Sequence, residues 1–142
     1  MKTSVLAVAL ASVVLAGLAV AQVARTKAPD GASVYFISPK NGDTVSATFT
    51  VQFGLKGMGV APAGVTAPNT GHHHLLIDVP KMPDMTMPLP ATDQIRHFGG
   101  GQTEVELKLP PGSHTLQLVL GDYLHTPHER PVVSDKITIT VK

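Results

Sequence analysis

Alternation of apolar and polar side chains with a period of two is the feature that most limits what this chain can fold into. In residues 48–55, for example, Phe49, Val51, Phe53 and Leu55 are separated by polar or small residues. This period belongs to an extended strand with one buried face, whereas an amphipathic helix has a period of 3.6. Helical periodicity does not appear after residue 32. The pattern therefore predicts an all-β fold whose strands turn one apolar face to the core and one polar face to water.

Turn residues divide the alternating runs into six strong strands and leave room for a seventh, short one. Prolines, glycines and small polar residues in segments 39–43 and 110–113 mark tight connections between runs. Antiparallel strands of this number and length predict an immunoglobulin-like β-sandwich of six to seven strands. In that topology the expected strands span 33–38, 47–56, 72–79, a short stretch within 82–98, 103–109, 114–121 and 135–141.

Residues 1–21 have the features of a signal peptide that precedes the folded part. Lys2 gives a positive start, an apolar run follows, and residues 19–21 form a small-x-small cleavage site. An uncleaved membrane anchor is the alternative, although the apolar run is a little short for a span of about 20 residues. We expect residues 22–32 to be a flexible lead-in and residues 33–142 to be one domain. The protein is then periplasmic or secreted in a bacterium, with no membrane span after cleavage.

Composition excludes several kinds of site and partner. The chain has no cysteine, so disulfides, thiolate metal sites and a lipid-modified cysteine at the cleavage site are excluded. Without Lys2, the basic and acidic residues are equal in number. We therefore expect no nucleic-acid partner, because such binding relies on excess positive charge. Tryptophan is absent, which leaves an aromatic platform for sugars with little support.

Histidines are the residues best suited to chemistry, and all seven lie at or after residue 72. Neutral imidazole is a good ligand for copper and zinc. On the strand expected at 72–79, His72 and His74 share one face and are about 6.5–7 Å apart, which suits one ion. His73 should turn toward the core on the opposite face, as a hydrogen-bonded core or boundary histidine.

The expected topology brings further histidines to the same place. In an immunoglobulin-like sandwich, the loop before strand 72–79 and the loop after strand 114–121 lie at one end. His125 and His128 follow the second of these strands, and His97 can approach the same end. The predicted ligands of a Cu or Zn ion are His72, His74, His97, His125 and His128.

Three other residues complete the predicted arrangement. Asp78 and Asp122 are expected to orient ligand rings by accepting their second N–H. His114 should be a solvated turn residue at the opposite end. The alternative remains open that all these histidines are structural, since motif matches produce false positives.

Met82, Met85 and Met87 form a second group in the long connection 80–102. Thioethers bind soft ions such as Cu(I). Methionine also fills irregular gaps in packing, and we favour loop packing here.

Three motifs resemble an uncharacterised family of small exported bacterial domains, a domain of unknown function. They are residues 71–78 (GHHHLLID), residues 97–104 (HFGGGQTE) and residues 110–122 followed by His125 and His128. The resemblance covers about residues 34–142. It implies a single-domain periplasmic protein with a histidine-rich signature, and it supplies no activity.

Three functions of different classes follow. The favoured one is a metal-binding module, which acts as a carrier, buffer or accessory and has the metal ion and another exported protein as partners. The second is an envelope interaction module that needs no metal. An enzyme is less favoured: a metal-dependent hydrolase would use Glu129 or Asp122 as its base, but no nucleophile or paired-carboxylate motif supports a reaction.

Overall fold

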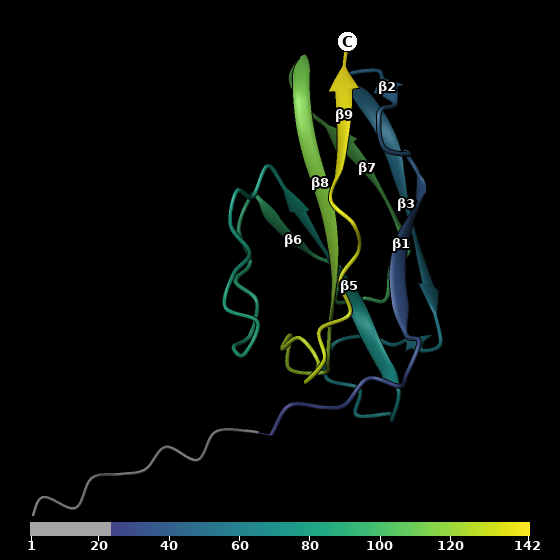
Figure 1. Cartoon of the computed structure of the whole chain (residues 1–142), viewed down its shortest axis with the longest axis vertical. Helices are drawn as coiled ribbons and strands as arrows, with labels where there is room; N and C mark the ends of the chain where they lie inside the picture. The colour runs from purple at the N-terminus through teal and green to yellow at the C-terminus, as the bar shows by residue number, and fades with distance from the viewer. Residues whose placement is uncertain (1–23) are drawn as a thin grey trace, which may run out of the picture.

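The computed structural model describes residues 24–142, which form two β-sheets and contain no helix (Figure 1). The predicted signal peptide, residues 1–21, lies outside the described residues. A search of residues 24–142 accordingly finds no helix with the length and hydropathy to cross a membrane.

Each sheet is built around three antiparallel strands. The smaller sheet has the order β1-β3-β7, with β1 at Ser33–Ser38, β3 at Thr48–Lys56 and β7 at Glu104–Lys108. The larger sheet contains β5, β8 and β9 as neighbours, at Thr70–Ile77, Gly112–Gly121 and Ile137–Val141. Three short strands extend it: β2 (Thr44–Val45), β4 (Gly59–Val60) and β6 (Ile95–His97).

The structure confirms the all-β sandwich and all six strong strands. The short strand expected within 82–98 is β6, and it pairs with β5 at an edge of the larger sheet. The parallel strands β2 and β4 were not predicted, because two residues are too few for a period of two to be visible.

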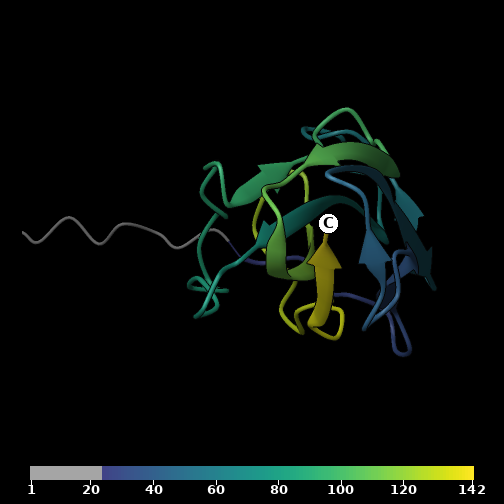
Figure 2. The ribbon, with the colours of Figure 1, turned by 90° about the horizontal axis from the view of Figure 1, so that it is seen from above.

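The core lies between the two sheets, which surround it when the molecule is viewed along its long axis (Figure 2). Odd-numbered residues of β5, such as Leu75 and Ile77, face Val51 and Phe53 of β3 across this space. His73 faces the same way, as expected, and its ring lies 5.1 Å from that of Phe53. The expectation that its ring would be hydrogen-bonded is wrong, because neither ring nitrogen has a partner among the described residues. Truncating a fully buried core side chain such as Leu75 typically costs about 2–5 kcal/mol.

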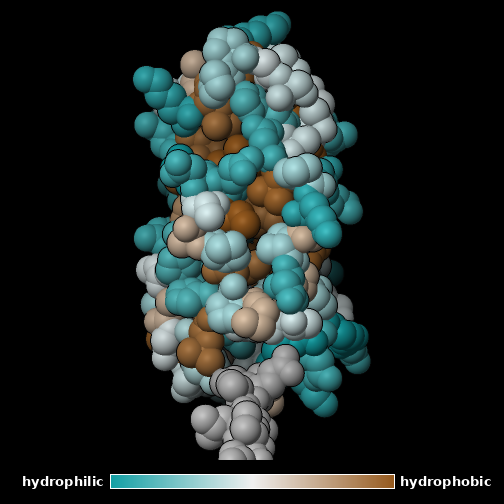
Figure 3. Space-filling model, turned by 90° about the vertical axis from the view of Figure 1, so that its left-hand side faces the viewer, coloured by the Kyte–Doolittle hydropathy of each residue, from teal (hydrophilic) through white to brown (hydrophobic). Residues whose placement is uncertain are grey.

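The expectation that every strand exposes a polar face is wrong for β5. All of its residues from Gly71 to Ile77 are buried, because the connection 79–94 covers the outer face of the larger sheet. Leu76 packs there in a second apolar cluster, against which Met82 and Met85 lie. Figure 3 views this side of the molecule, where apolar surface shows between polar side chains. The favoured loop-packing interpretation fits Met82 and Met85, whereas Met87 is 54% exposed.

Residues 24–32, for which the sequence suggests a flexible lead-in, make specific contacts with distant segments. Arg25 Nη1 donates to the carbonyl oxygens of Met85, at 3.1 Å, and His128, at 3.3 Å. The amide of Glu129 donates to the carbonyl oxygen of Thr26 at 2.8 Å. This segment therefore ties the 79–94 connection to the loop that follows β8.

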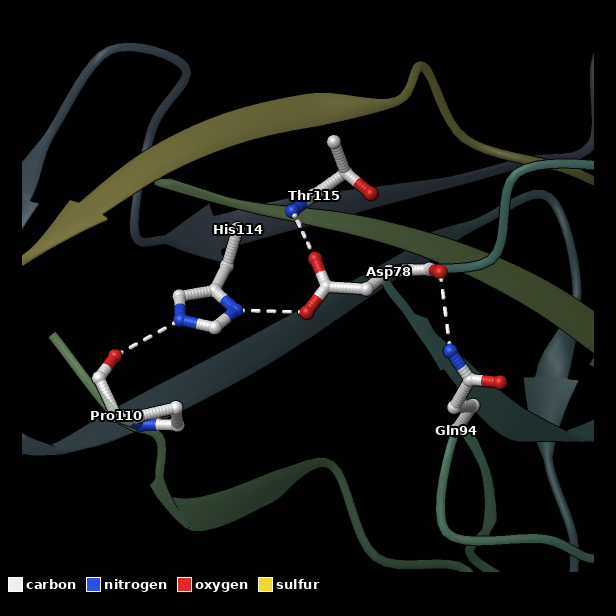
Figure 4. A network of polar contacts seen from close by, with 5 residues as sticks. All are labelled: Asp78, Gln94, Pro110, His114 and Thr115. Atoms are coloured by element: carbon white, nitrogen blue, oxygen red, sulfur yellow. Dashed lines mark hydrogen bonds and ion pairs between the residues drawn. The ribbon is translucent and has the colours of Figure 1, made fainter. Parts of the chain in front are cut away.

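Asp78 lies just beyond the last residue of β5, where it bonds residues near the start of β8 (Figure 4). Its Oδ1 accepts the Thr115 amide at 2.8 Å, and its Oδ2 lies 2.7 Å from His114 Nδ1. The expectation that Asp78 would orient a metal-ligand ring is therefore wrong, because β5 carries it to the far end from His72. His114 is also more than a solvated turn residue, since its ring is held between Asp78 and the Pro110 carbonyl.

The Asp78–His114 contact should make stability depend on pH. The hydrogen bond to Asp78 raises the pKa of His114 above its usual value. The contact therefore stabilises fully below about pH 6.5, the ordinary histidine pKa, and less as pH rises through the raised pKa. We expect Asp78→Asn, which can still accept the Thr115 amide, to cost about 1 kcal/mol at about pH 5.5 and less at about pH 9. Urea denaturation of both proteins at the two pH values measures this, and a cost independent of pH would contradict it.

Candidate metal centre

Four histidines from three segments meet at the end of the sandwich where β5 begins and β8 ends. We call them the histidine cluster: His72, His74, His97 and His125. Each offers a ring nitrogen, and these four atoms all lie within 4.8 Å of one another. The ring centroids are 4.5–6.1 Å apart in every pair, so each ring has the other three as neighbours.

The inner pair of the cluster, His72 and His74, is positioned by β5. The two residues are two positions apart on one strand and therefore share its outer face, and their exposed fractions are 0% and 1%. His97 reaches the cluster because β6 pairs with β5 in a register that places it opposite His74. Pairing of the two strands thus brings His97 of the edge strand beside His72 and His74 of the central strand.

His125, the fourth member, is presented by a turn that Asp122 builds. Asp122 Oδ1 accepts the amides of Leu124, at 2.9 Å, and Thr126, at 3.1 Å. The His125 amide donates to the Asp122 carbonyl at 2.9 Å, and the residue has a φ of 65°. Side-chain acceptors at such a position stabilise tight turns. His125 Nδ1 is thereby held 3.1 Å from His72 Nε2.

Two glycines leave room for the rings. A Cβ atom on Gly121 would lie 2.6 Å from His74 Cε1, and one on Gly99 would lie 2.3 Å from His97 Cε1. Contacts this short are not tolerated, so any larger residue would displace the ring. The cluster therefore depends on glycine at both positions.

The cluster contains buried polar atoms without hydrogen-bond partners. Among the described residues, neither ring nitrogen of His74 has a partner, and Nδ1 of His72 also lacks one. A buried polar group left unsatisfied costs about 1–3 kcal/mol. Most buried polar groups have a partner, and a metal ion bound to these nitrogens would be one.

The two inner rings are held in their neutral form. Burial, together with the smaller effect of the neighbouring histidines, lowers the pKa of His72 to about 4 and that of His74 to about 3. Burial also lowers the pKa of His97. The Asp122 carboxylate acts in the opposite direction on His72. Neutral imidazoles near a negative charge are ready to bind a cation without first releasing protons.

The spacing of the ring nitrogens is suitable for a single transition-metal ion. In a tetrahedral site with metal–nitrogen bonds of about 2.0–2.1 Å, the ligand atoms are about 3.3–3.5 Å apart. The four ring nitrogens lie within 4.8 Å of one another, so small movements of the two outer rings, His97 and His125, would bring them to these distances. His97 is exposed and His125 is half-buried, so these rings can make such movements.

The remaining predicted site residues lie outside the cluster. His128 is 1% exposed but is not among the four residues whose ring nitrogens meet. Asp122 makes no hydrogen bond to a cluster ring; it lies near His72 and shapes the turn that carries His125. Sequence reasoning missed the room that the two glycines leave for the rings, and it missed this turn, although the Gly-Asp pair at 121–122, directly after a strand, was a visible signal.

Comparison with known proteins gives one family. A family model described as Domain of unknown function (DUF4399) matches residues 51–142. No curated protein matches the chain. Among solved structures, an endo-beta-1,4-mannanase from Thermotoga petrophila is similar at a TM-score of 0.46 and 18% identity, over 78% of this chain and 20% of that one. The chain thus spans a fifth of the mannanase chain, and a likeness this weak carries no argument.

Protonation of the buried rings tests the electrostatics of the cluster directly. In metal-free protein followed by NMR, His72 should titrate near pH 4 and His74 near pH 3, with His73 also near 4 because of its burial. His114 should titrate above its usual pKa. Since the unfolded chain takes up these protons first, the folded protein should lose stability as pH falls from about 6.5 toward 4. Titration of His72 and His74 near pH 6.5 would show that these rings are not buried in solution.

Proposed function

Because the chain belongs to the DUF4399 family, whose description assigns no activity, we propose a function from the geometry of the histidine cluster. The protein is an exported module that binds one Cu(II) or Zn(II) ion through His72, His74, His97 and His125. It acts as a carrier, a buffer or an accessory that loads other exported proteins with metal. One observation carries the proposal: four ring nitrogens from three segments lie within 4.8 Å of one another.

Charge and hydrogen bonding both support cation binding at this place. Asp122 is 3% exposed and forms no ion pair with another described side chain. A buried carboxylate without a counter-charge is costly, and a divalent ion beside His72 would compensate it. Since each ring offers one ligand atom, the ion would also bind one of the two unpartnered nitrogens of His74. Removing both costs at once would link metal binding to greater fold stability.

The ligand set favours nitrogen-binding ions of the first transition row. Four imidazoles suit copper and zinc, and at equal availability the affinity order favours Cu(II) over Zn(II). Because the inner rings are neutral well below pH 6.5, protons compete with the ion less than the ordinary histidine pKa suggests. Binding should therefore persist in mildly acidic conditions.

Removal of single ligands tests the proposal. Untagged protein incubated with Cu(II) or Zn(II) and then dialysed should retain about one ion per chain. His97→Ala and His125→Ala should each bind the ion at least about 10–100-fold more weakly. Loss of a residue that only hydrogen-bonds to a metal ligand already costs that much, so loss of a ligand itself should cost no less. His97 is exposed, so its replacement is not expected to unfold the protein. Elemental analysis and competitive titration measure the stoichiometry and the affinity.

His114→Asn is the matched control, because it removes a histidine that lies outside the cluster. It should retain the full metal content. Equal metal content in all four proteins would eliminate the cluster as the binding site, and so would its absence from the unmodified protein.

The glycines beneath the rings give a second test, which separates ring position from fold stability. Gly121→Ala should displace the buried His74 ring, lowering both metal affinity and stability, the latter by about 1–3 kcal/mol as for other overpacked sites. Gly99→Ala should lower metal affinity with little loss of stability, because the exposed His97 ring can swing away. Thermal unfolding and metal titration of both variants check this. Unchanged affinity in both would mean that the ring positions do not matter.

A further inference from the structure

A cavity of about 320 Å³ lies next to the histidine cluster and is not part of it. Its walls come from three segments that are distant in sequence: residues 26–27, residues 65–70 and the loop that begins at Asp122. Asp122 and His128 are the buried polar residues that line it, with exposed fractions of 3% and 1%. A hollow with apolar walls and a few buried polar groups is a feature of ligand sites.

The Asp122 carboxylate has unused capacity to accept hydrogen bonds. Its Oδ1 is occupied by the amides of Leu124 and Thr126. Its Oδ2 accepts a single bond, from Thr26 Oγ1 at 3.2 Å, and Thr26 is itself a wall of the cavity. An ionised carboxylate has about four acceptor positions. In the metal-free protein, a cationic donor in the cavity would supply both the missing hydrogen bonds and a counter-charge.

His128 is the second buried polar side chain of the cavity wall. Burial lowers the pKa of its ring, so the imidazole is neutral and adds no positive charge that would compete with a cation.

We propose that this cavity binds a small primary amine in its ammonium form, carried on a short apolar chain. An ammonium group brings three donors and one positive charge to the Asp122 carboxylate, which is anionic and has acceptor positions left. Val65, Ala67 and Pro68 supply apolar wall for the chain. Lys27 also lines the cavity, but its side chain is 86% exposed and its ammonium lies 4.0 Å from Glu129. The proposal does not depend on metal binding at the cluster.

The first experiment compares an amine with its neutral analogue on metal-free protein. n-Butylammonium chloride and 1-butanol are titrated separately, and amide shifts are followed by NMR. Saturable shifts confined to residues 65–70, 122–123 and 128 are expected for the ammonium ion, with a dissociation constant in the millimolar range suited to so small a ligand. 1-Butanol should bind at least about tenfold more weakly. Equal binding of the two, or no saturation by the amine up to about 50 mM, would overturn the proposal.

Variants then assign the site. Asp122→Asn keeps an Oδ1 acceptor for Leu124 and Thr126 but removes the charge, so amine affinity should fall at least about tenfold. Ala67→Phe, at an exposed position in the wall, should block the cavity. Asp93→Asn is the control on another surface, and it should change nothing. His97→Ala should also leave amine binding unchanged, which separates this result from the metal proposal. Full amine binding by Asp122→Asn or Ala67→Phe would contradict the site.

Discussion

The antiparallel pairing of β5 with β8 is the interaction on which the rest of the site depends. Its register sets His72 opposite Gly121 and His74 opposite Val119. The outer face of β5 therefore carries two histidines, and the space over them is left free by a glycine. Because β8 ends at Gly121, Asp122 starts the next turn directly beside the cluster and returns His125 to it. A shift of one residue in this register would turn His73 outward and bury His72 and His74 in the apolar core.

This arrangement places polar rings where the fold alone would favour apolar ones. The same face of the larger sheet continues into the apolar cluster of Leu76, Leu89, Ile95 and Val119. Leucines at positions 72 and 74 would extend that cluster without unsatisfied nitrogens. The histidines instead keep polar atoms buried and unpartnered, which lowers stability. Local conflicts of this kind between packing and residue type are concentrated at functional sites.

Much of the fold could be predicted from the sequence, because a period of two reports directly on one-sided burial. The same reasoning brought His125 to His72 through the position of two loops in the sandwich. It failed where burial is two-sided: Leu76, an apolar residue on the supposed polar face of β5, was the one sign that connection 79–94 covers that face. Sequence reasoning also placed His128 in the cluster, because His125 and His128 lie in the same loop and nothing in the sequence distinguishes them. Only the turn geometry decides which of the two rings faces the cluster, and that geometry depends on hydrogen bonds to Asp122.

The four histidines of the cluster differ in how firmly the chain holds them, and this difference would affect how the site exchanges an ion. His72 and His74 lie on a central strand paired on both sides, so their rings are fixed by the sheet. His97 lies on a three-residue strand, and His125 lies in a turn with a positive φ. An ion bound by all four would therefore have a rigid inner pair and a movable, more exposed outer pair. Release of such an ion through the outer side would require only that the His97 and His125 rings swing away, with no change in the sheets. A site built in this way suits an ion that is exchanged better than one that is held permanently for structure, since closed structural sites fix all of their ligands.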